Sequence, residues 1–294
     1  MIGFFNINKA AGMTSHDVVA RMRRVVGRGV KVGHAGTLDP AATGVLPVAV
    51  GQATRLIEYL TDAQKGYRAL VALGTTTTTD DAEGEVLEQR AVPPLDHATL
   101  EAVLQQFRGP IMQVPPMYSA LHHQGQRLYD LARQGQHIEL EPRPVTISRL
   151  DLLAWSPDTA HLALLVECSK GTYIRALARD IGAALGCGAH LAVLERTFVG
   201  SFTVDAAAPL ETLQQAADLS PYLLPPDVVV SDWFPVTLSE GQARRVGNGN
   251  TVHLPNVAEA RVRAYTADGR LLALLECPDP AALAAQWQPL KVLQ

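Results

Sequence analysis

The chain lacks the features that mark secreted, membrane-spanning and metal-binding proteins. Its 294 residues include three cysteines, an odd number without metal-site spacing, which indicates reduced thiols in a cytoplasmic protein. No apolar run reaches the ~18 residues of a membrane span, and the N-terminus has neither a basic start nor a signal-peptide core. The sequence also shows no internal repeat or low-complexity tract. We therefore expect a globular cytoplasmic protein that has no membrane partner.

Acidic residues are missing from one segment of an otherwise acidic chain. The net charge is −4, yet residues 18–38 hold five basic side chains and no Asp or Glu. Residues 14–27 predict a helix, because apolar side chains recur there at helical spacing. Arg21, Arg24 and Arg28 then share the face opposite the apolar stripe. Such a face suits a polyanion, although a basic patch alone is more typical of a solvated helix surface.

A loop of small residues follows this segment and carries a single carboxylate. Residues 33–47 read Gly-His-Ala-Gly-Thr-Leu-Asp-Pro-Ala-Ala-Thr-Gly-Val-Leu-Pro, which places Asp39 between a glycine-rich run and a proline. An Asp-Pro pair is typical of a helix N-cap or a turn. Gly33 and Gly36, however, would let the backbone approach a ligand closely, and His34 adds a polar ring. Without a cysteine or a second carboxylate, this loop is not expected to bind a metal.

Hydrophobic periodicity along the rest of the chain indicates a mixed α+β protein. Strands are predicted at 66–73, 145–154 and 161–168, and helices at 52–61, 97–108 and 170–185. Arg175 would lie in the first turn of the last helix, where a cation opposes the helix dipole. This mildly unfavourable position suggests that Arg175 meets an anion, although a plain surface arginine is an equally good interpretation.

Two further segments suggest binding surfaces. Residues 113–144 are polar and contain paired prolines over a length that is unusual for a loop, so we expect an excursion with a binding role. Nearer the C-terminus, the strands of a small β-barrel are predicted at 234–238, 251–254, 259–266 and 270–277. The predicted division is therefore a body over residues 1–230 and a C-terminal domain over residues 231–294.

Short blocks in a fixed order run through most of residues 3–200. They are Lys9 with Gly12-Met13-Thr14-Ser15, the run from Gly33 to Pro40 with Ala42-Thr43-Gly44 and Leu46-Pro47, Lys65-Gly66-Tyr67, Pro116 to Leu121, Cys168 to Arg175, and Gly188 to Leu191 with Leu194. This ordered series resembles the TruB-type tRNA pseudouridine-55 synthases in their bacterial stand-alone form. Ala10 departs from it, where the family usually has proline, and Thr78 stands where many members have aspartate.

The resemblance implies a fold and an activity. The fold would be a mixed, largely antiparallel central sheet flanked by helices, followed by a small C-terminal β-barrel of PUA type that binds RNA. The activity would be the isomerisation of uridine to pseudouridine at position 55, in the T-loop of tRNA, without cofactor or metal. Because the target base is stacked inside a folded loop, it must be flipped into a pocket. The partner would be the tRNA T-arm, bound by a monomer that needs no obligate protein partner.

The resemblance also assigns roles to residues. Asp39 would supply the essential ionised carboxylate, which either attacks the sugar or assists its deprotonation, and Arg175 would pair with it. Tyr67 would stack on the flipped base and could move a proton, while His34 would take the place of the base. The other substrate-binding residues would be Lys9, Gly36, Tyr173, Leu194 and Arg143, with Arg21, Arg24 and Arg28 gripping the RNA together with the 113–144 excursion.

Two other functions would use the same scaffold. One is a non-catalytic protein that binds or folds RNA, which the basic helix and the barrel would serve equally well. The presence of Asp39, Tyr67 and Arg175 argues against this function. The other is a guide-RNA-dependent pseudouridine synthase, whose members typically carry basic extensions, whereas this chain ends in a neutral aliphatic tail.

Overall fold

One large mixed sheet runs through the body of the protein. The computed structural model describes residues 1–118, 122–123, 126–127, 138, 140–282 and 285–293, and in these residues the sheet has eleven strands. In spatial order, eight of them are β14 (Ala208–Pro209), β1 (Gly3–Lys9), β3 (Thr43–Val50), β12 (Ala189–Val199), β4 (Lys65–Leu73), β11 (His161–Cys168), β10 (Arg143–Ser156) and β7 (Gly109–Gln113). The others are β13 (Phe202–Thr203) beside β12, β15 (Leu223–Leu224) beside β1, and β2 (Val32–His34) beside β3. The expected mixed, largely antiparallel sheet is confirmed.

The two halves of this sheet meet where β3 runs parallel to β12. Thr43 lies opposite Glu195 and Gly44 lies opposite Arg196 in this short pairing. The backbones approach closely here, because a Cβ atom on Gly44 would lie 2.2 Å from the carbonyl oxygen of Arg196. The joint therefore depends on glycine at position 44.

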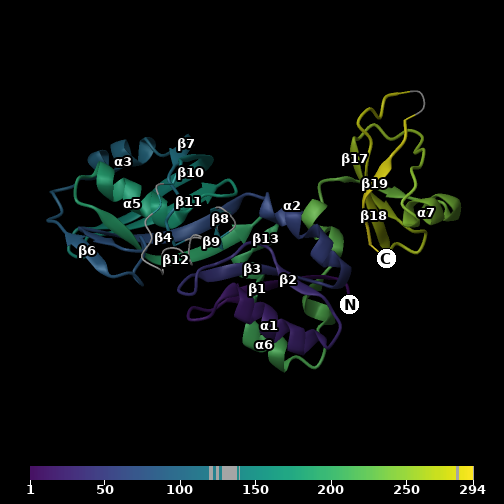
Figure 1. Cartoon of the computed structure of the whole chain (residues 1–294), viewed down its shortest axis with the longest axis horizontal. Helices are drawn as coiled ribbons and strands as arrows, with labels where there is room; N and C mark the ends of the chain where they lie inside the picture. The colour runs from purple at the N-terminus through teal and green to yellow at the C-terminus, as the bar shows by residue number, and fades with distance from the viewer. Residues whose placement is uncertain (119–121, 124–125, 128–137, 139, 283–284, 294) are drawn as a thin grey trace.

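Helices cover the two halves separately (Figure 1). On the N-terminal half, α1 (Ser15–Val26) and α6 (Leu210–Gln215) pack on β1 and β3 through a core that includes Val18, Met22 and Leu46. On the other half, α3 (His97–Gln105) and α5 (Ile174–Ala184) bury apolar side chains such as Leu104 and Ile181 against the sheet. In the chain between β3 and β4, η1 (Gly51–Leu56) continues into α2 (Ile57–Thr61), and both pack in the core that the body shares with the C-terminal region. No helix among the described residues is long and apolar enough to cross a bilayer.

The C-terminal region forms a second, smaller sheet. Its strands are β16 (Phe234–Thr237), β17 (Arg261–Tyr265), β18 (Leu271–Glu276) and β19 (Gln288–Val292), with α7 (Glu240–Gly247) packed beside them. These four strands fit the expected PUA-like fold. The strand predicted at 251–254 is wrong, since Val252 forms only an isolated bridge with Trp287 there. The fourth strand is β19, which the hydrophobic pattern did not reveal. The division between residues 230 and 231 stays a prediction.

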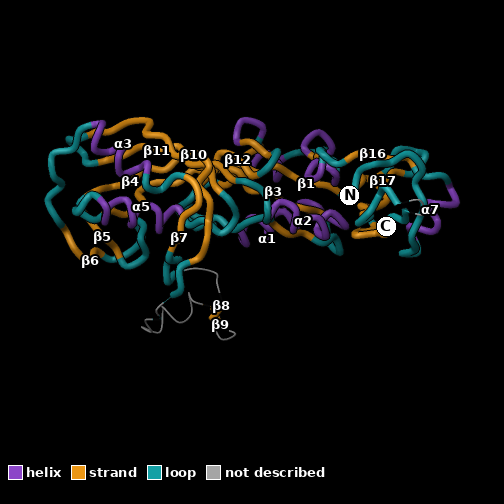
Figure 2. Tube along the Cα trace, turned by 90° about the horizontal axis from the view of Figure 1, so that it is seen from above, coloured by secondary structure: helices purple, strands orange, loops and turns teal. Residues whose placement is uncertain are grey.

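This C-terminal sheet shares a core with the body, so the molecule is elongated but continuous (Figure 2). Leu271, Leu274 and Leu293 pack in the same apolar cluster as Phe4 and Leu56. The remaining short elements are β5 (Thr75–Thr77), β6 (Val86–Gln89), β8 (His122–His123), β9 (Gln126–Arg127), η2 (Val204–Ala206), η3 (Ser220–Tyr222) and η4 (Pro226–Val230).

Most of the elements predicted for the body are present. The strands predicted at 66–73, 145–154 and 161–168 and the helices predicted at 14–27, 97–108 and 170–185 are confirmed, with ends shifted by a few residues. The predicted helix at 52–61 is part 3₁₀ and part α. The loop expected over 33–47 is wrong at both ends, because β2 and β3 occupy them. Strand β3 is buried on both faces, so its sequence does not alternate as a half-exposed strand does.

The close approach at Gly44 predicts a difference between two glycine substitutions. Gly27 and Gly44 have similar positive φ angles, +94° and +98°, but a Cβ atom at Gly27 would meet nothing within 4 Å. Gly27 combines this φ with a ψ of 166°, a region almost restricted to glycine, so we expect Gly27→Ala to lower the free energy of unfolding by roughly 1–3 kcal/mol from backbone strain alone. Gly44→Ala should lower it by a further ~1–3 kcal/mol, because the methyl group collides with backbone. Thermal unfolding of both variants measures the difference; equal losses would contradict the steric argument.

Candidate active site

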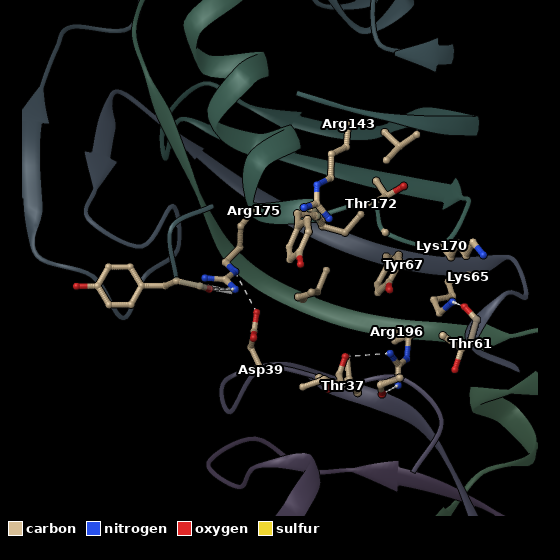
Figure 3. A pocket seen from close by; sticks show the side chains of 18 of the residues that line it. Thr37, Asp39, Thr61, Lys65, Tyr67, Arg143, Lys170, Thr172, Arg175 and Arg196 are labelled. Carbon is tan, nitrogen blue, oxygen red and sulfur yellow. Dashed lines mark hydrogen bonds and ion pairs between the residues drawn. The ribbon is translucent and has the colours of Figure 1, made fainter. Parts of the chain in front are cut away.

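A cavity of about 680 Å³ opens beside the joint between the two sheet halves (Figure 3). The loop between β2 and β3, strands β4 and β12 and the start of α5 all contribute side chains to its wall. Seven of the residues expected at the site line it: Gly36, Asp39, Tyr67, Arg143, Tyr173, Arg175 and Leu194. These residues are spread over some 160 positions of the chain, and the crossing of the strands brings them together.

Asp39 lies at the edge of the cavity, on the loop that joins β2 to β3. The backbone makes a turn here, with the Ala42 amide donating to the Asp39 carbonyl oxygen over 3.1 Å. No helix follows, so the N-cap interpretation is wrong. The carboxylate points instead toward Arg175, and its Oδ2 lies 3.0 Å from the arginine Nε (Figure 3). The Asp39 side chain keeps 40% of its surface exposed, so a ligand in the cavity can reach it.

Arg175 is almost fully buried and has four acceptors around its guanidinium. Besides Asp39, these are Asp81 Oδ2 at 3.4 Å, the Thr79 carbonyl at 3.1 Å and the Tyr118 carbonyl at 2.9 Å. A planar guanidinium held from several sides has one orientation, so the carboxylate of Asp39 is oriented as well. The position of Arg175 in the first helical turn suggested that it meets an anion. Asp39 and Asp81 are the anions that it contacts.

The charge balance around Asp39 does not simply favour its ionised form. Burial raises the pKa of Asp39 above its usual value, and the negative charge of Asp81 adds to this effect. Arg175 lowers the pKa of Asp39, as does Lys9 to a smaller extent, but burial is the larger influence. Removal of Arg175 would therefore leave a carboxyl group that ionises poorly.

A second arginine of α5 holds the same neighbouring loop. Arg179, one turn after Arg175, lies 2.9 Å from Asp80 Oδ2 and donates to the carbonyl of Val114 over 2.9 Å. Asp80 has a positive φ of 60°, a conformation that non-glycine residues adopt at some cost. The ion pair thus stabilises the turn that presents Thr79 and Asp81 to Arg175.

The departure from the family at position 78 does not remove the local carboxylate. The Thr78 hydroxyl accepts a hydrogen bond from the Glu85 amide over 3.1 Å, so it closes the turn. Asp81 supplies the carboxylate that contacts Arg175. The sequence did not predict this contact, because Asp81 and Arg175 lie far apart in the chain.

Tyr67 has an arginine as its direct cross-strand neighbour. Tyr67 on β4 is 7% exposed, and Arg196 lies opposite it on β12. Both side chains line the cavity. Sequence reasoning missed Arg196, although a basic residue within an apolar strand pattern was a signal that could have found it. Lys65, at the start of β4, also lines the cavity, and burial lowers its pKa to about 8.

Several expected binding residues lie outside the cavity wall. Lys9 is fully buried, and its Nζ donates to the carbonyls of Ala10, Met13 and Pro40, so it ties the N-terminal strand to the turn after Asp39. Burial lowers the pKa of Lys9 to about 8. His34 is half-buried on β2, and burial lowers its pKa as well.

The basic helix and the excursion are described in part. Arg24 and Arg28 are exposed and Arg21 is half-exposed, away from the cavity. Of the excursion expected over 113–144, residues 119–121, 124–125, 128–137 and 139 lie outside the described residues. Gly33 was expected to admit a ligand, but a Cβ atom there would lie 2.9 Å from Ile57 Cδ1, so its smallness serves packing.

Comparison with known proteins shows to which family the chain belongs. The family described as "TruB family pseudouridylate synthase (N terminal domain)" matches residues 23–174, and "tRNA pseudouridylate synthase B C-terminal domain" matches residues 175–231. The chain belongs to the TruB family. Its relatives include the tRNA pseudouridine synthase B of Pseudomonas fluorescens, 46% identical over 96% of this chain and 93% of that protein. The Thermobifida fusca protein of the same name is 48% identical over 93% of this chain and 94% of its own length.

A solved structure shares the fold of this TruB family member. An H/ACA ribonucleoprotein bound to a substrate RNA containing 2'-deoxyuridine aligns over 99% of this chain and 85% of its own, with a TM-score of 0.75 and 24% identity. This likeness supports the architecture alone. In the described part of the chain, no group of three or more His, Cys, Asp or Glu side chains could hold a metal ion.

Burial and Arg175 shift the pKa of Asp39 in opposite directions, so the removal of Arg175 should change that pKa measurably. Replacement of Arg175 by Gln removes the attraction that lowers the pKa of Asp39, so we expect that pKa to rise further. NMR titration of ¹³C-labelled aspartate, with Asp39→Asn to assign the signal, measures the change. Arg179→Gln is the matched control, because it removes an arginine of the same helix that pairs with Asp80. A larger shift in the control than in Arg175→Gln would contradict the assignment.

Proposed function

We propose that this protein isomerises uridine to pseudouridine at position 55, in the T-loop of tRNA, without a cofactor. The observation that carries the proposal is the Asp39–Arg175 ion pair at the edge of a cavity that Tyr67 also lines, in a chain of the TruB family. The reaction conserves all atoms: the bond from ribose C1' to N1 breaks, the base turns, and C1' joins C5. A proton leaves C5 and N1 gains one, so neither oxidant nor reductant is needed.

The proposed role of Asp39 requires its ionised form. Its carboxylate either attacks the ribose or assists deprotonation of the sugar, and both routes need an exposed, oriented anion. Arg175 supplies the orientation through its Nε, and Asp81 with two backbone carbonyls holds Arg175. Arg175 opposes the effect of burial on the Asp39 pKa, and therefore favours the reactive, ionised form.

The remaining cavity residues would bind the flipped base. Tyr67 would stack on the ring and accept or donate a proton through its hydroxyl, with Tyr173 and Leu194 as the apolar walls. Arg143 is exposed at the rim, where it would contact a phosphate. His34 would fill the space in the RNA that the base leaves. Lys9 would contribute indirectly, through the turn after Asp39 that it holds.

The proposed partner is the T-arm of tRNA, bound by a monomer in the cytoplasm without an obligate protein partner. The basic residues Arg21, Arg24 and Arg28 and the 113–144 excursion would grip its backbone, and the domain over residues 231–294 would reach further along the RNA. A non-catalytic RNA-binding function would not require an oriented carboxylate at a cavity, which is why we favour the enzyme. A guide-dependent enzyme would be inactive on tRNA alone, so activity without guide RNA separates the two.

The proposal predicts separable losses of chemistry and binding. On unmodified tRNA transcript, Asp39→Asn should lower single-turnover pseudouridine formation by roughly 10⁴-fold or more, because the substitution removes the charged oxygen offered to the ribose. Its affinity for the transcript, measured by filter binding, should stay within a few-fold of wild type. If the wild-type protein binds the transcript tightly yet forms no pseudouridine without guide RNA, the proposed function fails.

The basic face of α1 predicts a change in salt dependence. Replacement of Arg21, Arg24 and Arg28 by Ala should make the slope of log affinity against log salt shallower by about 2–3, if each contacts one phosphate. The rate of the chemical step at saturating protein should be unchanged, because none of the three lines the cavity.

A matched control is available elsewhere on the molecular surface. Arg68, Arg90 and Arg149 are also exposed, but each is already paired with a carboxylate, at 3.3, 2.7 and 2.6 Å. Their triple Ala variant should keep the wild-type slope. If the triple variant of Arg21, Arg24 and Arg28 keeps the wild-type slope, these arginines do not contact phosphates and are simply solvated.

A further inference from the structure

Arg196 is a buried cation without a carboxylate partner. Its side chain is among the largest that are fully buried, with 1% of the residue exposed. In the described part of the chain, no Asp or Glu forms an ion pair with it. Burial of an unpaired charge costs free energy, so other interactions in the folded protein must compensate for it.

Three backbone carbonyls provide part of this compensation. Arg196 Nε donates to the Val45 carbonyl over 2.7 Å, and its two terminal nitrogens donate to the carbonyls of Gly36 at 3.0 Å and Thr37 at 3.3 Å. Figure 3 shows the guanidinium beside Thr37, on the loop that leads to Asp39. Arg196 therefore holds the loop on which Asp39 lies, two residues before the carboxylate.

Tyr67 is the remaining neighbour. It is the direct cross-strand partner of Arg196, and side chains at such positions lie on the same face of a sheet with Cβ atoms about 5 Å apart. Both side chains also line the cavity, and the guanidinium acts on the Tyr67 hydroxyl as a nearby positive charge. Burial raises the pKa of Tyr67, and Arg196 opposes this effect more strongly than any other group.

We propose that Arg196 is a positioning residue that holds the Asp39 loop against β4 and biases the Tyr67 hydroxyl toward its ionised form. A phenolate beside Arg196 would give the buried guanidinium the anionic partner that it otherwise lacks. The ionised hydroxyl is the form that accepts a proton, so the bias matters for the proton that leaves C5 of the base. This last consequence rests on the proposed function, whereas the effect of Arg196 on Tyr67 does not.

The test replaces Tyr67 by 3,5-difluorotyrosine in the full-length protein and follows its ionisation by ¹⁹F NMR without RNA. Fluorination lowers the pKa of a phenol into a range where proteins stay folded. We expect Arg196→Met to raise that pKa by about one pH unit or more, because it removes the positive charge beside the hydroxyl. Arg196→Lys, which keeps the charge, should raise it by less.

Arg68→Met is the matched control. Arg68 follows Tyr67 on β4 and lies opposite Glu195, one position from Arg196, but it is exposed and already paired. The Arg68→Met substitution should change the pKa of residue 67 by no more than a few tenths of a pH unit. Equal changes in Arg68→Met and Arg196→Met, or no change in Arg196→Met, would overturn the proposal. If the methionine variant does not fold, Arg196→Gln retains an amide donor for the loop carbonyls and takes its place.

A second measurement follows the reaction. With natural tyrosine at position 67, the pH profile of single-turnover pseudouridine formation by Arg196→Met should move toward higher pH. Its rising limb should lose about tenfold in rate for every pH unit by which the profile moves. If the rate falls but the pH profile does not shift, Arg196 only positions the Asp39 loop. That result would refute its effect on the ionisation of Tyr67. Because the NMR titration uses no RNA, its failure is distinct from failure of the proposed function.

Discussion

The ion pair between Asp39 and Arg175 is the interaction on which the site depends. It joins a loop of the N-terminal half of the sheet to a helix that packs on the other half. Burial alone would leave Asp39 protonated over more of the pH range, and Arg175 opposes that tendency. The pair is therefore both a structural link across the cavity and the source of a charged oxygen at its edge.

Three arginines surround this pair, and each donates hydrogen bonds to backbone carbonyls of a neighbouring segment. Arg175 and Arg179 hold the turn at residues 79–81, while Arg196 holds the loop before Asp39. A guanidinium has five donors in a plane, so it can fix two segments at once, which a lysine ammonium does less well. These arginine side chains therefore hold the loops around the cavity in place.

The sequence alone predicted the α+β class, most strands and helices of the body and the cavity residues that lie in recognisable blocks. It missed Arg196: the basic residue within an apolar strand pattern was a signal, but the position of Arg196 opposite Tyr67 arises from the pairing of β12 with β4, which no local pattern encodes. The prediction of one long loop over the β2–β3 region was wrong, since a strand buried on both faces carries no alternating signal. The role of Lys9 was misplaced for a similar reason: its three carbonyl partners come from segments up to 31 residues apart.

Strand β1 has a consequence for how the chain acquires its structure during synthesis. It pairs with β14 and β15, which contain residues 208–209 and 223–224, while β3 pairs with β12. One edge of β1 is covered early by β3, but its other edge stays open until about three quarters of the polypeptide has been made. Such long-range pairing slows folding and leaves strand edges open to other chains in the meantime. The sheet edge at β1 would thus close late, after every residue that lines the cavity, from Gly36 to Arg196, has been synthesised.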